Sequence, residues 1–145
     1  MAEFVRDPVH GVIPLDHDEF NLLDHWAVQR LRRIKQLSMT YLVYPGAVHT
    51  RFEHTLGAIH LAGVMADTLG LPAHQREVVR LAALCHDLGH GPFSHASEAA
   101  LRDLNPLQAS ATTSGIHEQI SLDVIDMLLN EGKLTDLQRN EVRDL

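Results

Sequence analysis

The sequence predicts an all-α fold, built as one packed bundle of helices. Three observations favour it. Alternating runs of β-branched residues are missing, aromatic residues make up only 5% of the chain, and residues that begin or end helices recur along it. With 145 residues, the chain is expected to form a single domain, residues 1–145, large enough to bury its own core.

Capping and helix-breaking residues give the expected helix boundaries. Asp16 with Glu19 forms a capping-box pattern that opens a short helix to about residue 23. Gly70 and Pro72 end a long helix that starts near residue 52. The other expected helices span, in chain order, about residues 26–37, 73–86, 95–104 and 117–130, and from 136 to the end, with a loop at 105–115.

The composition argues against several classes of protein. The sequence contains no run of about 18 apolar residues, so no membrane span is expected. The single cysteine, Cys85, rules out an intramolecular disulfide and fits a reducing cytoplasm, which is the expected location. A net charge of -7 argues against a broad nucleic-acid-binding face.

Histidine is the most informative residue type, with 11 dispersed copies. His86 is followed directly by Asp87, and His54 lies upstream in the long helix. Imidazole and carboxylate ligands together suit Mn, Fe, Ni or Zn, whereas Mg is less natural beside imidazoles. The sequence therefore predicts a divalent metal held by His54, His86 and Asp87.

Helical spacing puts both histidines on apolar faces, which we expect to point to the core. A single core histidine is more often structural, bonded to a backbone carbonyl. Two on neighbouring helices favour a metal, because the adjacent aspartate is costly to bury unless it is paired or metal-bound. The two faces are His54, Ala58, Leu61 and Met65, and Val79, Ala82, Ala83 and His86.

Six segments spread over nearly the whole chain form a recognisable pattern. They are DPVHG (7–11), QRLRRIKQL (29–37), YPGA (44–47), RFEHTLG (51–57), CHDLGHGPFSH (85–95) and HEQ (117–119). Through them the chain resembles the HD-domain metal-dependent phosphohydrolases, specifically the deoxynucleoside triphosphate triphosphohydrolase branch. The resemblance implies an HD-domain helical bundle.

The resemblance also implies catalytic roles. His54, His86 and Asp87 match metal ligands, and His117 matches a histidine that gives a proton to the leaving group. His90 and His95 match residues that contact the α-phosphate and its surroundings. Glu98 matches an acidic residue that orients the catalytic histidine.

Nucleotide-binding roles follow from the same resemblance. Arg51 matches an arginine that clamps phosphate, and Gln36 and Leu37 match residues near the sugar. A further set falls where some relatives bind a regulatory nucleotide. Its members are Asp24, Gln29 and Arg32.

The chain departs from the family's pattern at one position. The family's fourth metal ligand is an aspartate well downstream, and Asp123, Asp126 and Asp144 lie too early to match it. Residues 1–145 are therefore expected to lack the C-terminal part that carries this ligand. Two explanations stay open: the chain is the first part of a longer protein, or water completes the site. The isolated chain is expected to be weakly active or inactive.

The implied activity is metal-dependent hydrolysis of deoxynucleoside triphosphates to deoxynucleoside and triphosphate. The residue types fit, since a bound metal activates water and imidazole titrates near neutral pH. Two alternatives remain: another HD-type nucleotidase or phosphodiesterase, and a non-catalytic nucleotide-binding module. The expected partners are a nucleotide and further copies of the same chain, with no membrane.

Overall fold

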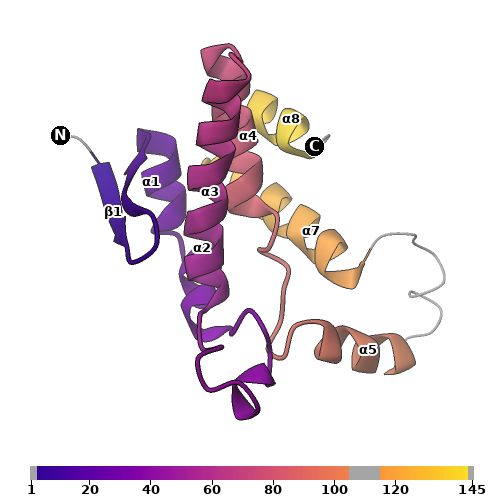
Figure 1. Ribbon diagram of the computed structural model, residues 1–145. Coiled ribbons are helices and arrows are strands. Elements are labelled where there is room, and N and C mark those ends of the chain that lie inside the picture. Colours follow the sequence, from indigo (N-terminus) through magenta and orange to yellow (C-terminus); the bar gives the residue numbers. More distant parts are fainter. Residues whose placement is uncertain (1–2, 105–114, 144–145) are drawn as a thin grey trace.

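The computed structural model of the protein describes residues 3–104 and 115–143, and most of their side chains (Figure 1). Apart from one small two-stranded sheet, the described elements are helices, so the prediction of an all-α fold is confirmed. The elements are β1 (Glu3–Asp7), β2 (Gly11–Leu15), α1 (His17–Leu23), α2 (Trp26–Gln29), η1 (Arg30–Arg33), η2 (Thr40–Leu42), α3 (Arg51–Thr68), α4 (Ala73–Cys85), α5 (His95–Leu104), α7 (Ile116–Asn130) and α8 (Asp136–Arg143).

Helices α3 and α4 form the centre of the molecule. Figure 1 shows them side by side, with β1 and α1 on one side and α7 and α8 on the other. Thr50 and Glu53 form a capping box that starts α3. The fully buried side chains Ile59, Leu81 and Leu84 are part of the core between these elements. No helix in the described part of the chain is long and apolar enough to cross a membrane.

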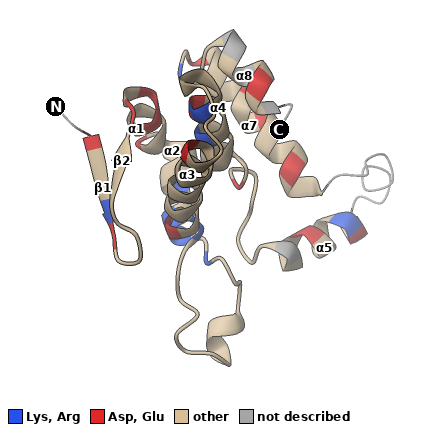
Figure 2. Ribbon diagram, turned by 45° about the horizontal axis from the view of Figure 1, so that its top comes forward, with Lys and Arg blue, Asp and Glu red and all other residues tan. Residues whose placement is uncertain are grey.

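A buried ion pair holds α1 against α4. Arg80 donates from Nε and Nη2 to the two carboxylate oxygens of Glu19, each at 2.6 Å. Arg80 also donates to the carbonyl oxygens of Pro14, at 2.9 Å, and Ile59, at 3.3 Å. Figure 2 shows basic residues along α4 and near the start of α3, and acidic residues on the flanking helices α1, α7 and α8.

The hairpin of β1 and β2 was not predicted from the sequence. The strands pair antiparallel, with Glu3 opposite Leu15 and Asp7 opposite Gly11. Asp7 Oδ1 accepts the N–H groups of Val9 and His10, at 2.9 and 2.8 Å, and this side-chain turn reverses the chain. Only five residues form each strand, so the alternation is too short to stand out in the sequence.

The expected helix over residues 26–37 is wrong in its second half. The α-helix ends at Gln29, a 3₁₀ helix follows to Arg33, and the chain then runs extended beside the start of α3. Ile34 accepts the N–H of Arg51 at 2.8 Å, and Gln36 donates its N–H to the His49 carbonyl at 3.1 Å. These long-range backbone bonds replace the local helical ones.

The expectation that the His54 and His86 faces point to the core is wrong for the His54 face and only partly right for the His86 face, where Ala82 packs against the core. Leu61 and Met65, which share the face of His54, are 51% and 62% exposed. The buried face of α3 instead carries an alternative set of small and apolar residues. It includes Phe52, Thr55, Leu56, Gly57, Ile59, Gly63 and Ala66. On α4, Val79, Ala82 and Ala83 are half-buried and His86 is exposed.

Candidate metal centre and adjoining histidine cluster

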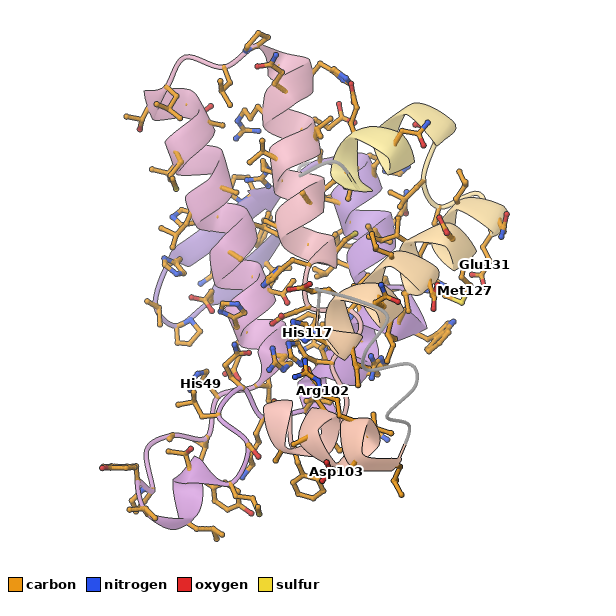
Figure 3. All side chains as sticks on the ribbon, turned by 90° about the vertical axis from the view of Figure 1, so that its right-hand side faces the viewer. His49, Arg102, Asp103, His117, Met127 and Glu131 are labelled. Atoms are coloured by element: carbon orange, nitrogen blue, oxygen red, sulfur yellow. The ribbon has the colours of Figure 1, made fainter. Side chains whose placement is uncertain are left out.

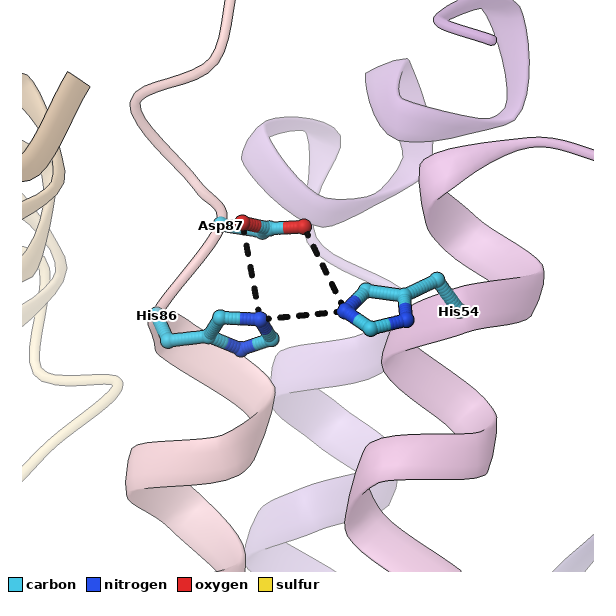
Figure 4. A group of neighbouring side chains, drawn as sticks. All are labelled: His54, His86 and Asp87. Atoms are coloured by element: carbon cyan, nitrogen blue, oxygen red, sulfur yellow. Dashed lines mark hydrogen bonds and ion pairs between the residues drawn. The ribbon is translucent and has the colours of Figure 1, made fainter. Parts of the chain in front are cut away.

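Three side chains from two neighbouring helices converge on one point. His54 projects from the first turn of α3, His86 is the C-cap of α4, and Asp87 follows it directly. His54 Nε2 and His86 Nε2 lie 3.3 Å apart, and the carboxylate oxygens of Asp87 lie 3.7 Å from the first and 3.4 Å from the second. Figure 4 shows the two imidazole edges and the carboxylate facing one another.

The donor set fits a divalent transition metal. The three ligand atoms lie within 4.8 Å of one another, two from imidazole and one from carboxylate. The Nδ1 atom of His86 lies 2.8 Å from the Ala83 carbonyl oxygen, which turns Nε2 toward the other two residues. Burial lowers the pKa of His54, and the nearby Asp87 offsets only part of this effect. A neutral imidazole is the form that binds metal.

Asp87 is held by an arginine on α3. Arg51 Nη1 donates to Asp87 Oδ2 at 2.6 Å, and both side chains are almost fully buried. Burial raises the pKa of the Asp87 carboxyl, but His86 and Arg51 beside it outweigh burial and hold that pKa below its usual value. The carboxylate therefore stays charged, as a metal ligand must.

A second cluster adjoins the first. His117, in the first turn of α7, has its Nδ1 2.6 Å from Glu98 Oε1 on α5. His90 stacks on His117 with ring centroids 4.0 Å apart, and its Nδ1 lies 3.6 Å from the same Glu98 oxygen. Figure 3 shows His117 at the start of α7, among side chains between the ends of the central helices and α5.

Asp87 and His90 connect the two clusters. Asp87 Oδ1 lies 3.4 Å from His90 Nε2, so one carboxylate faces both the candidate ligands and the second cluster. The turn from His86 to His90 carries members of both groups. Groups able to hold a metal and groups able to move a proton therefore lie next to each other.

Comparison with known protein families identifies the family of this chain. The sequence model of the HD domain family matches residues 51–144. The chain belongs to the HD domain family. The match contains both candidate ligand helices and the whole second cluster of this HD domain.

Individual relatives match the chain as well, two of them over more of its length. The deoxynucleoside triphosphate triphosphohydrolase SAMHD1 of Homo sapiens is 43% identical over 133 residues, which are 87% of this chain and 21% of that protein. The same enzyme of Gallus gallus is 40% identical over 142 residues, 93% of this chain and 22% of that protein. An uncharacterized protein of Methanocaldococcus jannaschii is 48% identical over 94 residues, 65% of this chain and 20% of that protein. The chain thus spans about a fifth of the length of these relatives.

The other expected site residues of this HD domain lie in different places. Gln36 and Leu37 lie beside the start of α3, and Gln36 Oε1 is buried with no hydrogen-bond partner among the described residues. The side chain of His95 lies outside the described part of the chain, although its backbone begins α5. Its expected role therefore stays a prediction.

The three residues expected to bind a regulatory nucleotide lie near one another at the α1–α2 corner. Arg32 Nε donates to Gln29 Oε1 at 2.8 Å, and Gln29 Nε2 donates to the Leu23 carbonyl at 2.8 Å. Asp24, the next residue, is the exposed C-cap of α1. Arg32 also lies over the ring of Phe52, 3.6 Å from its centroid, so this corner packs on the first turn of α3.

Several residues around the HD site were not singled out from the sequence as part of it. Ser94 Oγ accepts from Arg51 Nη2 at 2.9 Å, Ser121 Oγ bonds the turn after α4, and Arg30 donates to the Leu88 carbonyl. Serine and arginine are common surface residues, and these contacts join positions far apart in sequence. Only the fold identifies them.

Proposed function

We propose that residues 1–145 form the metal-binding part of an HD-domain hydrolase that converts deoxynucleoside triphosphates to deoxynucleoside and triphosphate. The observation that carries this proposal is the contact of two clusters through one carboxylate, Asp87, which lies 3.4 Å from both His86 Nε2 and His90 Nε2. The names of the relatives from Homo sapiens and Gallus gallus support this substrate class.

His54, His86 and Asp87 would hold the metal, which supplies an activated water and neutralises phosphoryl charge when bound. Arg51 keeps Asp87 oriented and charged from its buried side, at 2.6 Å. Arg51 was expected to clamp phosphate. Its hydrogen bonds to Asp87 and Ser94 favour a second role, in which the guanidinium orients the Asp87 carboxylate.

The second cluster would protonate the leaving group. Water adds to the phosphorus nearest the sugar, and the bond from that phosphorus to the sugar oxygen breaks. The sugar oxygen then needs a proton, and the imidazole of His117 can give one. Glu98, 2.6 Å from His117 Nδ1, orients this ring so that its other nitrogen faces away from the carboxylate.

Phosphorus NMR of the products tests the reaction. The protein is loaded with Zn²⁺, a diamagnetic ion that does not broaden phosphorus signals, and kept in excess over dGTP, so that slow turnover is also detected. We expect inorganic triphosphate as the first product. Pyrophosphate or phosphate as the first product would favour another HD-type nucleotidase. If dGTP binds but stays intact both with this chain and with an extended chain that supplies a downstream aspartate, a nucleotide-binding module is favoured.

His117→Ala tests the proton donor. The variant should keep its metal and lose about 10² to 10⁴ in single-turnover rate, the usual contribution of a general acid. His74→Ala is the matched control, because His74 pairs with Glu141 on α8, in a separate contact between α4 and α8. A rate for His117→Ala equal to that of the control would remove His117 from the mechanism.

A further inference from the structure

We infer that Ser121 is a positioning residue that sets the spacing between the two histidine clusters. This inference rests on the proposed function, because it names the residue that fixes the position of the metal ligands relative to the proton donor. Ser121 lies on α7, four residues after His117, so both point from the same face of the helix. Nothing in its sequence context distinguishes it from other serines.

The hydroxyl of Ser121 bridges two backbone groups of the turn after α4. Ser121 Oγ accepts the N–H of Gly89 at 2.8 Å and donates to the carbonyl of His86 at 3.1 Å. Ser121 is only 4% exposed, so water does not readily replace these bonds. One hydroxyl thus connects α7 to the turn that carries His86 and Asp87.

Gly89 permits the close approach that these bonds need. A Cβ atom at Gly89 would lie 2.0 Å from the His117 carbonyl oxygen and 2.5 Å from the Ser121 backbone nitrogen. Any larger residue would push the first turns of α7 away from the turn. The helix and the turn are therefore in direct backbone contact, and Ser121 is the polar link across it.

The position of this link explains its effect on the site. His86 and Asp87 are two of the three candidate metal ligands. His117 lies in the second cluster, where its ring stacks on that of His90 with 4.0 Å between the ring centroids. A shift of α7 against the turn changes the distance between the metal group and His117. Loss of the hydroxyl also leaves the His86 carbonyl and the Gly89 N–H without this partner, both at the end of a helix.

The test compares Ser121→Ala with Thr68→Ala. Thr68 is a suitable control because its hydroxyl also donates to a backbone carbonyl, that of Val64, at the far end of α3. Imidazole ¹H–¹⁵N spectra report the surroundings of each histidine, and Co²⁺ titration reports metal affinity and ligand geometry through visible absorption. Neither measurement requires turnover.

We expect Ser121→Ala to shift the imidazole signals of His117 and His86 while those of His17 and His74 stay in place. Its Co²⁺ affinity should fall about tenfold or more, the usual effect of losing a group that orients metal ligands. Thr68→Ala should match the unaltered protein in both. A Ser121→Ala protein that melts at a lower temperature but keeps the His117 and His86 signals and the Co²⁺ affinity would overturn the inference.

A second variant covers the case in which Ser121→Ala does not fold. Ser121→Thr keeps the hydroxyl and should give Co²⁺ affinity and spectra like those of the unaltered protein, and loss of both would contradict a role for the hydroxyl. If the unaltered protein binds no Co²⁺, the proposed function loses its metal. The His117 signals in the absence of metal still decide the role of Ser121.

Discussion

Among the residues that the structure describes are two buried arginine–carboxylate pairs, and they differ in how completely they are bonded. In the Glu19–Arg80 pair, two guanidinium nitrogens meet two carboxylate oxygens, and Glu19 Oε2 also accepts the N–H of Asp16 at 2.9 Å. In the Arg51–Asp87 pair, one nitrogen meets one oxygen at 2.6 Å. The other oxygen of Asp87 faces His86 and His90, each at 3.4 Å.

The difference separates a structural pair from one that we propose to be functional. Glu19 is bonded within its own pair and capping box, and it joins α1 to α4 in the interior. Asp87 keeps one oxygen directed at His86, a candidate metal ligand, and at His90 in the second cluster, at distances too long for good hydrogen bonds. The two pairs are alike in burial and charge. They differ in the other groups that each carboxylate faces, and we base the functional distinction on these groups.

Removing Glu19 should have the largest effect on stability. Glu19→Ala leaves the Arg80 guanidinium buried without its charge partner, which is expected to lower the free energy of unfolding by about 3–5 kcal/mol. Urea denaturation of the two proteins measures it. Because Glu19 makes no contact with the histidine clusters in the structure as described, molecules that remain folded should still bind Co²⁺. A small loss of stability would mean that the bidentate pair is not the structural link we infer.

Removing Asp87 should have a smaller effect on stability and a complete one on metal binding. Asp87→Ala should lower the free energy of unfolding of the metal-free protein by about 2 kcal/mol, because it removes one hydrogen bond from Arg51, whereas Glu19→Ala removes two from Arg80 and the bond to the Asp16 N–H. Elemental analysis after dialysis should find near-stoichiometric metal in the unaltered protein and background levels in the variant. Asp123→Ala, which removes an exposed carboxylate of α7, is the matched control and should keep its metal. Equal metal contents in the unaltered protein and Asp87→Ala would refute the assignment.

Ser94 offers a finer distinction within the open pair. Ser94→Ala removes the second partner of Arg51 but leaves the Arg51–Asp87 bond, so the free energy of unfolding should fall by about 1 kcal/mol. Metal content should be unchanged. Ser97→Ala provides a comparison, because its hydroxyl donates to the Ser94 carbonyl at 2.7 Å and does not contact Arg51. If Ser94→Ala lost its metal as Asp87→Ala does, Arg51 would depend on both partners to orient the carboxylate.

Local sequence signals predicted the helix ends well. The capping pattern of Asp16 with Glu19 is formed in the structure, where a carboxylate oxygen of Glu19 accepts the N–H of Asp16 at 2.9 Å. The candidate metal residues His54, His86 and Asp87 also come together as expected. These features depend on residues that are close in sequence or on a strong chemical pattern.

Features set by long-range contacts were not predictable in this way. The helix expected to reach residue 37 ends early because Ile34 and Gln36 bond to backbone groups near the start of α3. The outward face of α3 was mistaken for the core face because that helix carries apolar residues on both sides, such as Leu56 inside and Met65 outside. For the same reason, the sequence revealed neither the Glu19–Arg80 pair nor the Ser121 link.

The exposed pair of Arg76 with Asp67 should have the smallest effect and gives the lower limit for the comparison. Arg76 Nε lies 2.8 Å from Asp67 Oδ1, a distance like those in the buried pairs, but the side chains are 30% and 62% exposed. Water and salt screen such a pair, so Asp67→Ala should lower the free energy of unfolding by at most about 1 kcal/mol. Urea denaturation at low and high NaCl measures this loss of free energy of unfolding. Screening at high NaCl should reduce the difference between the variant and the unaltered protein. A loss as large as that of Glu19→Ala would show that the bond itself, rather than its burial, determines how much these ion pairs stabilise the fold.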